Sequence, residues 1–180
     1  MKYEIITLQD KQIIGMSREI AFNKGPEECP KFWNEYVEKI AKPVFMEGKT
    51  PNEFQKAAID NNVGEFALCT CQLANHDCMT CASENFAACS AKNFTYVIGG
   101  EYKGGKVPEG MNLYPIPNGR WLKVYFEGGM AAFQNQYAYF HEEWLPQHPE
   151  LTIAKNRCMM EWYAPFHLLG QIDPIVTTNK

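Results

Sequence analysis

The sequence predicts an α+β domain made of two similar halves, and two observations support this prediction. The order strand, turn, strand, helix, strand, strand can be traced twice, roughly over residues 1–105 and again over 106–180. The main helix of each half carries a single apolar stripe, which is typical of a helix packed on one side only. This order implies an antiparallel sheet with both helices on one face and a central cleft where the halves meet. At 180 residues, we expect the chain to form a single domain.

The first half opens with two predicted strands, over residues 3–8 and 12–20, in which apolar side chains recur. A helix should follow, with Pro30 in its first turn, where the missing N–H costs no hydrogen bond. Pro43 should end or kink this helix, because proline removes a donor and crowds the preceding turn. The apolar stripe of the helix consists of Trp33, Tyr36, Val37, Ile40 and Val44.

A second, short helix is predicted to begin at Thr50. Thr50 and Glu53 have the spacing of a capping box, with a proline at the first helical position between them. Two strands complete the half, over residues 64–71 and 94–98, and the second is rich in β-branched and aromatic residues. A cysteine-rich loop, residues 69–92, separates them.

The second half repeats this order after a connector at residues 107–110. Strands are predicted over 111–116 and 120–127, joined by a Pro-Asn-Gly turn. The helix that follows ends at Pro146, and its apolar residues alternate in steps of three and four, so that they share one face: Met130, Phe133, Tyr137, Phe140 and Trp144.

The end of the chain is the weakest part of the strand pattern. Residues 157–163 read as a strand that is mostly apolar and aromatic. Residues 171–178 make a poor strand, because Pro174 cannot donate to a ladder of hydrogen bonds. The sequence therefore favours a poor closing strand for the second half, or a different closure.

Composition and charge exclude several classes of protein. The 17 Lys and Arg residues are scattered with no two adjacent, and the net charge is -4, so we expect no nucleic-acid partner. No apolar run approaches the roughly 20 residues of a membrane-spanning helix, and we expect no membrane partner. The N-terminus lacks the features of a signal peptide, so a cytoplasmic location is expected.

Five of the seven cysteines fall within the predicted loop region, with His76 among them. An odd number of cysteines in a reducing compartment does not indicate a disulfide framework. Cys78 and Cys81 have the spacing of one zinc-binding pair, but the second close pair of a zinc site is missing. We therefore expect neither a metal nor another cofactor. The five residues are Cys69, Cys71, Cys78, Cys81 and Cys89.

The segment Met159 to Tyr163 places an acidic residue among apolar ones. On a strand, Met159, Glu161 and Tyr163 face one way. An unpaired buried carboxylate is costly, which leaves three interpretations. Glu161 is solvated, or it pairs with a basic residue (Arg157, Arg120 or Lys123), or it waits in a cavity for a cationic ligand or a proton transfer. The local pattern alone favours the first two interpretations.

Several segments together resemble the GyrI-like effector-binding domain, which occurs alone or attached to AraC-type and MerR-type regulators. Their order and spacing agree over roughly residues 94–164, and the N-terminal half matches more loosely through residues 3–5 and the helix that carries Trp33. The matching segments are residues 108–111, 114–121, 126–128, 141–146 and 160–163.

The resemblance implies a duplicated fold of SHS2 type with a central pocket for a small molecule. In such domains a glutamate on the late strand, ringed by aromatic residues, receives hydrophobic and often cationic molecules, and the matching residue here is Glu161. A desolvated carboxylate and aromatic faces both attract cations. For aromatic residues at such positions, core packing is at least as common a role as contact with a ligand. The candidates for the aromatic wall of the pocket are Tyr163, Trp121, Tyr96, Trp33 and Tyr36.

Two further functions follow from the same resemblance. Some relatives resemble hydrolases of strained, cyclopropane-bearing toxins, for which Glu161 and Tyr163 would be the catalytic pair. The family name also suggests an inhibitor that binds a protein such as DNA gyrase. No helix-turn-helix segment is visible, so direct binding of an operator by this chain is not expected. A stand-alone binding domain for a hydrophobic, cationic small molecule is the preferred hypothesis.

Overall fold

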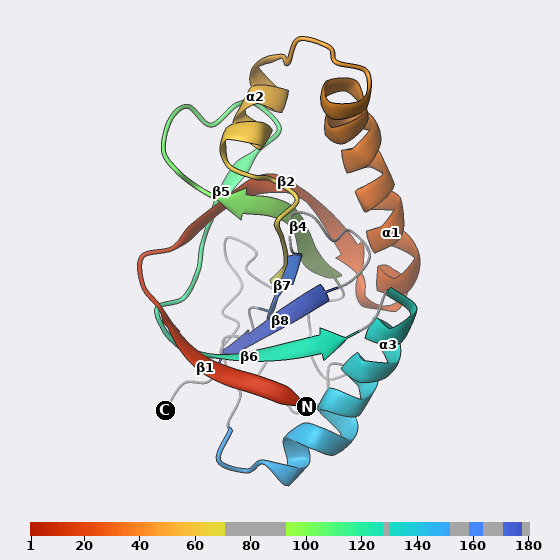
Figure 1. The fold of residues 1–180 in the computed structure, drawn as a ribbon, viewed down its shortest axis with the longest axis vertical. Helices are drawn as coiled ribbons and strands as arrows, with labels where there is room; N and C mark the ends of the chain where they lie inside the picture. Colours follow the sequence, from red (N-terminus) through yellow and green to blue (C-terminus); the bar gives the residue numbers. More distant parts are fainter. Residues whose placement is uncertain (71–92, 128–129, 152–158, 164–170, 178–180) are drawn as a thin grey trace.

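The structure is a computed structural model of the 180-residue chain (Figure 1). It describes residues 1–70, 93–127, 130–151, 159–163 and 171–177. Within these ranges it contains eight strands and three α-helices, and two of the helices continue as π-helical or 3-10 turns. The fold is the predicted α+β class, with an antiparallel sheet and packed helices.

The elements of the first half follow the predicted order. Strands β1 and β2 come first, and a short 3-10 turn leads into α1, which continues as a π-helix. Helix α2 and strands β3 and β4 complete the half. The bounds are β1 Lys2–Leu8, β2 Gln12–Ala21, the 3-10 turn Phe22–Lys24, α1 Gly25–Tyr36, the π-helix Val37–Met46, α2 Glu53–Asp60, β3 Phe66–Thr70 and β4 Asn93–Glu101.

The second half repeats the order without a counterpart of α2 among its described residues. Its main helix also changes from α to π geometry before it ends, as α1 does. The bounds are β5 Asn112–Pro115, β6 Gly119–Glu127, α3 Met130–Tyr139, the π-helical turn Phe140–Trp144, the 3-10 turn Leu145–Gln147, β7 Met159–Tyr163 and β8 Gln171–Thr177.

All eight strands belong to one antiparallel sheet in the order β1-β6-β8-β7-β3-β4-β2-β5. This order reads the same from both ends when each strand is replaced by its counterpart in the other half. Strands β7 and β3 form the middle pair, and they join the halves through a register that pairs Ala67 with Glu161 and Cys69 with Met159. The topology therefore supports the duplication inferred from the sequence.

The first strand of each half pairs with the other half, which the sequence did not indicate. Strand β1 pairs with β6, and β5 pairs with β2. The two turns that follow these exchanged strands are bonded to each other: the Asp10 N–H donates to Asn118 Oδ1 at 2.7 Å, and Asn118 Nδ2 donates to Asp10 Oδ1 at 3.2 Å. The halves are thus tied at the edges of the sheet as well as at its centre.

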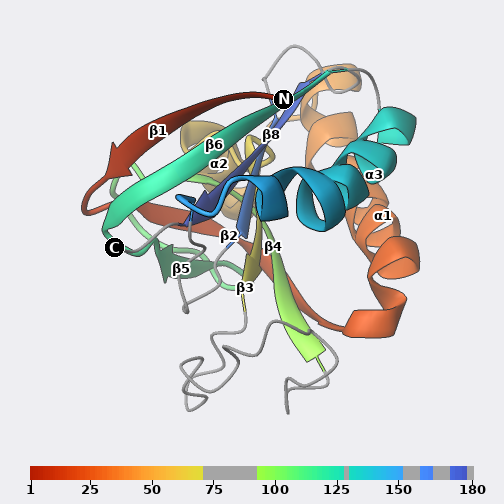
Figure 2. The ribbon, with the colours of Figure 1, turned by 90° about the horizontal axis from the view of Figure 1, so that it is seen from below.

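Helices α1 and α3 lie on the same side of the sheet, as predicted (Figure 2). One core cluster lies between α1, α2 and strands β2 to β4, and it includes Ile14, Phe32, Ile40 and Ile98. A second lies between α3 and β6 and includes Val124, Phe126 and Phe140. A third covers the opposite face of the sheet, with Phe66, Leu68, Val97, Trp121 and Met160. Apolar side chains therefore cover both faces of the middle strands.

Helix α1 begins earlier than predicted, and the helical segment that it opens does not end at Pro43. It starts at Gly25, so Pro26 occupies the first turn, and Pro30 lies inside the helix. Glu27 and Glu28 in the first turn favour this start, because their negative charges interact favourably with the positive end of the helix dipole. The chain continues past Pro43 to Met46 as a π-helix, and Gln55 Nε2 donates at 2.8 Å to the Lys39 carbonyl, which an α-helical N–H at position 43 would have used.

The capping prediction for α2 was wrong by two residues, although the helix itself is present. Asn52, not Thr50, is the N-cap, and its side chain accepts from the Gln55 N–H at 2.9 Å. The Gln55 side chain accepts from the Asn52 N–H at 3.0 Å, which completes the capping box. Asparagine is as good a cap as threonine or better, so the later start is favoured.

The prediction of a poor final strand was also wrong. Residues 171–177 form β8, which lies inside the sheet between β6 and β7. The register with β6 pairs Ile175 to Thr177 and then resumes at Ile172, so this ladder passes over Pro174. Pairing on the other side is continuous, with Pro174 opposite Glu161. A proline is tolerated here because its missing N–H coincides with the interruption of one ladder.

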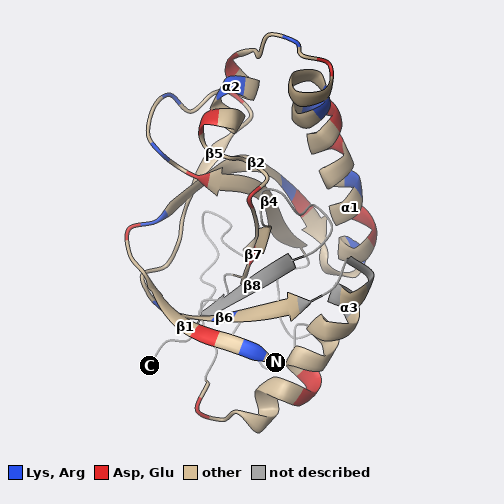
Figure 3. Ribbon diagram, viewed as in Figure 1, with Lys and Arg blue, Asp and Glu red and all other residues tan. Residues whose placement is uncertain are grey.

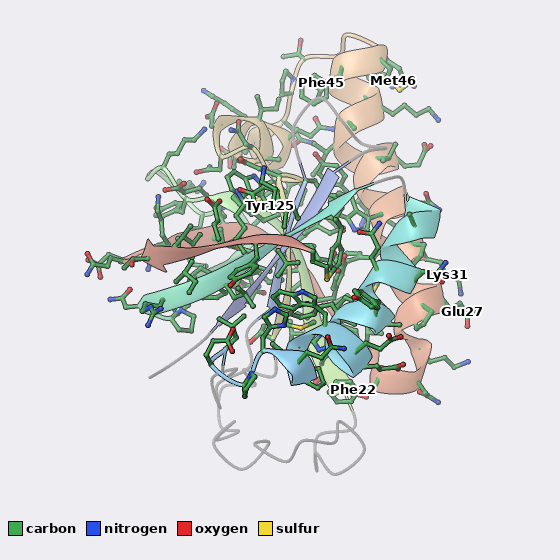
Figure 4. The ribbon with its side chains drawn as sticks, turned by 60° about the horizontal axis from the view of Figure 1, so that its bottom comes forward. Phe22, Glu27, Lys31, Phe45, Met46 and Tyr125 are labelled. Atoms are coloured by element: carbon green, nitrogen blue, oxygen red, sulfur yellow. The ribbon has the colours of Figure 1, made fainter. Side chains whose placement is uncertain are left out.

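The surface of α1 carries both signs of charge (Figure 3). Glu27 and Lys31 project from the outer side of this helix and are 2.6 Å apart (Figure 4). At the end of the same helical segment, Phe45 and Met46 are the most exposed large apolar residues of the described chain (Figure 4). Among the described residues, no helix combines the length and the apolar character needed to cross a membrane.

Candidate functional site

The candidate site is built around Glu161, on the middle strand β7. The alternation of the strand places Glu161 on the side of α1 and α3, while Met160 joins the cluster on the opposite face. Glu161 lies opposite Ala67, a fully buried small residue. The acidic residue therefore stands where the two halves of the chain meet, between the two main helices.

Two hydrogen bonds join Glu161 to tyrosines, and a third joins one of these tyrosines to a tryptophan. Tyr96, on β4, donates from its hydroxyl to Glu161 Oε2 at 3.1 Å, and the Tyr163 hydroxyl donates to the same oxygen at 2.5 Å. Trp33, on α1, donates from Nε1 to the Tyr96 hydroxyl at 3.0 Å. The result is a continuous chain of donors from α1 through β4 to the carboxylate. We call these four residues the Glu161 cluster.

The neighbours of Glu161 along β7 contact both helices. The Tyr163 ring meets the Trp33 ring edge to face, with centroids 5.0 Å apart, which links β7 to α1. Met159 accepts through its sulfur from the Tyr137 hydroxyl of α3 at 3.4 Å. Because Met159, Glu161 and Tyr163 share a face, the carboxylate lies between these two contacts.

Burial dominates the electrostatics of the cluster. It raises the pKa of Glu161 above its ordinary value, and the two tyrosine hydrogen bonds oppose this shift only in part. Burial and the neighbouring carboxylate also raise the pKa of Tyr96 and of Tyr163, so both remain hydroxyl donors. No lysine or arginine of the described chain is among the causes that set the pKa of Glu161. Within the described residues, the carboxylate thus has hydrogen-bond donors but no counter-charge.

The second oxygen of Glu161 accepts no hydrogen bond from the residues that the structure describes. Both tyrosines donate to Oε2, and none of the hydrogen bonds within the described chain ends on Oε1. Glu161 itself is intermediate in exposure, as is Trp33, whereas Tyr96 and Tyr163 are buried. A carboxylate in this state can accept a further hydrogen bond, attract a cation or exchange a proton.

Two of the predicted wall residues are not joined to Glu161 by a contact. Tyr36 packs edge to face on Trp33, but its hydroxyl donates to the Val63 carbonyl at 2.6 Å and is committed to the core. Trp121 is fully buried in the cluster on the opposite face of the sheet, and its Nε1 donates to the Pro117 carbonyl at 3.1 Å. The structure therefore brings together Glu161, Tyr163, Tyr96 and Trp33 of the predicted set.

Sequence reasoning missed two cysteines beside the cluster. Cys29, four residues before Trp33 on α1, is half-buried, and burial together with the Glu161 charge raises its pKa to about 12. Cys69, on β3, pairs with both Tyr96 and Met159 in register. The spacing of Cys29 from Trp33 was a usable signal, because residues four apart share a helix face.

The remaining members of the cysteine cluster, Cys71, Cys78, Cys81 and Cys89, lie outside the described residues. So do Arg157, one proposed partner of Glu161, and residues 71–92 of the predicted loop, whose first two residues, Cys69 and Thr70, belong to β3. Lys123, another proposed partner, bonds Glu4 instead. Within the described residues, no group of three or more His, Cys, Asp or Glu side chains is arranged to hold a metal ion.

The fold and the cluster together define a duplicated α+β domain with an acidic, aromatic centre. Residues 1–163 match the sequence model of the GyrI-like small molecule binding domain. The match spans most of the chain, which therefore belongs to this family of small-molecule-binding domains. No curated protein sequence matches it.

Solved structures show the same fold at low sequence identity. One is SAV2435 bound to tetraphenylphosphonium, with a TM-score of 0.67, 13% identity and coverage of 98% of this chain and 94% of that one. Another is a putative transcription regulation protein from Staphylococcus aureus MU50, with a TM-score of 0.64, 14% identity and 99% of each chain covered. A third is an integron cassette protein from the mobile metagenome of Vibrio cholerae, with a TM-score of 0.52 and 12% identity. The match covers 97% of this chain and 95% of that one.

Proposed function

We propose that this domain binds hydrophobic, cationic small molecules and that Glu161 supplies the counter-charge. The observation that carries the proposal is the state of this carboxylate. One oxygen of the carboxylate accepts two tyrosine hydroxyls, and the other accepts no hydrogen bond from the described residues. No lysine or arginine among those residues offsets its negative charge. A cation would remove the cost of this uncompensated charge.

The roles within the Glu161 cluster differ. Trp33 is partly exposed, so its ring can offer a face to a cation, and its N–H fixes Tyr96. Tyr96 and Tyr163 are buried and act by aiming the carboxylate rather than by broad contact with a ligand. Tyr36 and Trp121 support the core instead. The tetraphenylphosphonium bound to SAV2435 is a lipophilic cation of the class that such a site would take.

The proposal is tested by titrating the purified domain with tetraphenylphosphonium in a calorimeter. Wild type should bind, and Glu161→Gln should lose at least about tenfold in affinity, equivalent to about 1.4 kcal/mol. Glutamine keeps the size of the side chain and an oxygen for the tyrosine hydroxyls, so the change removes mainly charge. Equal affinities of the two proteins would refute the central role of Glu161.

Glu4→Gln is the matched control. Glu4 also lies on a strand and accepts a tyrosine hydroxyl, from Tyr125, but it is exposed and already bonded to Lys123. The substitution changes the net charge of the domain by the same amount as Glu161→Gln does. It should leave binding within about twofold of wild type, because an exposed charge is screened by solvent. A loss as large as that of Glu161→Gln would mean that net charge, not the site, attracts the cation.

A second candidate function is hydrolysis of a strained electrophile. The contact between the Tyr163 hydroxyl and Glu161 favours it, because burial raises the pKa of Glu161 toward the range in which a carboxyl can exchange protons near neutral pH. Incubation with a cyclopropane-bearing electrophile and detection of its ring-opened product would test this function. Product formed by wild type but not by Glu161→Gln would support the enzyme. Cation binding without product would leave the domain as a binder.

A further inference from the structure

The strand that carries Glu161 is held from its other face by Trp162. The Trp162 ring stacks on Phe66 with centroids 5.7 Å apart and planes at 30°, and the Lys123 ammonium lies 4.2 Å from the ring centroid. The indole Nε1 donates to Glu65 Oε1 at 3.2 Å. The Trp162 ring therefore contacts an aromatic ring and an ammonium group, and its N–H edge bonds a carboxylate. Each contact restricts the residue between Glu161 and Tyr163 in the chain.

Glu65 makes a second contact with the same end of β7. Its backbone carbonyl accepts from the Tyr163 N–H at 2.7 Å. One residue thus bonds the side chain of Trp162 on one face of the sheet and the backbone of Tyr163, whose side chain lies on the other. Tyr163 is the last residue of β7, so this bond fixes the point from which its hydroxyl reaches Glu161.

The segment before Glu65 is itself fixed to α1 and β4. The Val63 carbonyl accepts the Tyr36 hydroxyl at 2.6 Å, and the Gly64 N–H donates to the Gly99 carbonyl at 3.0 Å. Gly64 has a φ of +104°, and a Cβ at this position would lie 2.5 Å from the Tyr36 hydroxyl oxygen. Only glycine fits this bend without displacing the tyrosine. Glu65 therefore projects from a rigid base.

We propose that Glu65 is a positioning residue for cation binding, acting through Trp162 and Tyr163 to hold the Tyr163 hydroxyl on the Glu161 carboxylate. The inference rests on the proposed function, because it assigns Glu65 a role in the same site. Among the described residues, the Glu65 side chain accepts from Trp162 and makes no hydrogen bond with a member of the Glu161 cluster. Its effect passes through β7, by a side-chain bond on one face and a backbone bond at the strand end.

The test compares three variants in calorimetric titrations with tetraphenylphosphonium, from about pH 5 to about pH 8. Glu65→Met removes the acceptor but keeps the length of the side chain. Glu65→Gln removes the charge but keeps an oxygen that can accept from Trp162. Trp162→Phe removes the donor and keeps an aromatic ring against Phe66 and Lys123.

Glu65→Met should weaken binding by about 3- to 10-fold and move the pH midpoint of binding upward, because a loosened tyrosine stabilises ionised Glu161 less. Glu65→Gln should stay within about twofold of wild type, since a neutral acceptor still bonds the indole. Trp162→Phe should weaken binding as Glu65→Met does, and the double variant should be no weaker than either single one.

Three results would overturn the positioning role. Wild-type affinity and pH midpoint in Glu65→Met would show that the bond is not coupled to the site. An equal loss in Glu65→Gln would show that the charge of Glu65 acts directly on the cation. Additive losses in the double variant would separate the two residues. If Glu65→Met fails to fold in a thermal melt, the comparison of Glu65→Gln with Trp162→Phe decides.

The failure of this inference can be told apart from failure of the proposed function. If Glu161→Gln weakens binding while Glu65→Met does not, the site stands and Glu65 has no part in it. If Glu161→Gln binds as wild type does, the proposed function fails, and the role of Glu65 fails with it.

Discussion

Two carboxylates in this domain accept hydrogen bonds from tyrosine hydroxyls, but their pKa values are shifted in opposite directions. Glu4, on the edge strand β1, accepts the Tyr125 hydroxyl and lies 3.3 Å from the Lys123 ammonium, which itself lies over the rings of Tyr125 and Trp162. Figure 4 marks Tyr125 on β6, next to β1. Glu161 also accepts tyrosine hydroxyls among aromatic rings, but without a lysine or arginine of the described residues. We call Glu4, Tyr125 and Lys123 the Glu4 cluster. Within the part of the chain that the structure describes, the Glu4 cluster contains its own cation and the Glu161 cluster does not.

The pKa shifts of the two residues record this difference. The Tyr125 hydrogen bond and Lys123 lower the pKa of exposed Glu4. Burial raises the pKa of Glu161, and two tyrosine donors are not enough to reverse the shift. Burial therefore outweighs the two tyrosine donors at Glu161, whereas exposed Glu4 has little burial to offset the Tyr125 hydrogen bond and Lys123. A nearby positive charge would likewise lower the pKa of Glu161. In the Glu4 cluster the chain supplies that charge, and we infer that in the Glu161 cluster a ligand does.

The largest expected effect comes from giving the Glu161 cluster an internal cation. Cys29 lies on the cluster side of α1, close enough for the Glu161 charge to raise its pKa. In Cys29→Lys, the new ammonium should pair with Glu161 as Lys123 pairs with Glu4, and affinity for tetraphenylphosphonium should fall by about 100-fold. Cys29→Met fills a similar volume without charge and should lose far less. Equal losses in calorimetric titrations would attribute the effect to volume.

The second prediction concerns pH. A permanent cation should bind the ionised form of Glu161, so apparent affinity should fall as pH drops through the pKa of this residue, by about tenfold per unit below it. Because burial raises this pKa, the fall should begin at a higher pH than an ordinary glutamate would give. Titrations over a pH series measure it, with Glu161→Gln as the control, which should show a flat profile. A wild-type profile that stays flat down to the ordinary glutamate pKa would contradict the expectation.

The third prediction is that, without ligand, Glu161→Gln and Glu4→Gln change the free energy of unfolding in opposite directions. The stability linked to a raised carboxyl pKa is present at low pH and is lost as pH rises through the folded-state value. At neutral pH, Glu161→Gln should therefore raise the free energy of unfolding by roughly 1 kcal/mol. Glu4 has a lowered pKa, so its contribution is present at neutral pH and Glu4→Gln should lower stability slightly. Urea denaturation measures both, and shifts of the same sign would remove the distinction between the clusters.

The sequence alone predicted the duplicated order of elements and the shared face of Met159, Glu161 and Tyr163, because both follow from short-range periodicity. It did not predict the exchange of β1 and β5 between the halves, which depends on pairings about 100 residues apart along the chain. The final strand was missed because Pro174 is tolerated only through an interruption of one ladder, a property of the assembled sheet.

Only some residues of the site could be predicted, because short-range periodicity relates residues on one strand but not on different elements. Tyr163 shares a strand with Glu161, and two-residue alternation places both on one face. Tyr96 and Trp33 were chosen because they are aromatic, and so were Tyr36 and Trp121. Only tertiary structure separates the first pair, which bonds toward Glu161, from the second, whose polar atoms bond the Val63 and Pro117 carbonyls.

The smallest expected effect is at the far end of the donor chain. Trp33→Phe removes the indole N–H that donates to the Tyr96 hydroxyl but keeps an aromatic ring against Tyr163. Tyr96 would still donate to Glu161, so affinity for the cation should fall by only about two- to threefold. Tyr96→Phe removes the donor adjacent to Glu161 and should cost more, and the two substitutions should not add, because Trp33 acts on the carboxylate through Tyr96. Additive losses in titrations of the double variant would instead mean that the Trp33 indole N–H acts on the ligand independently of Tyr96.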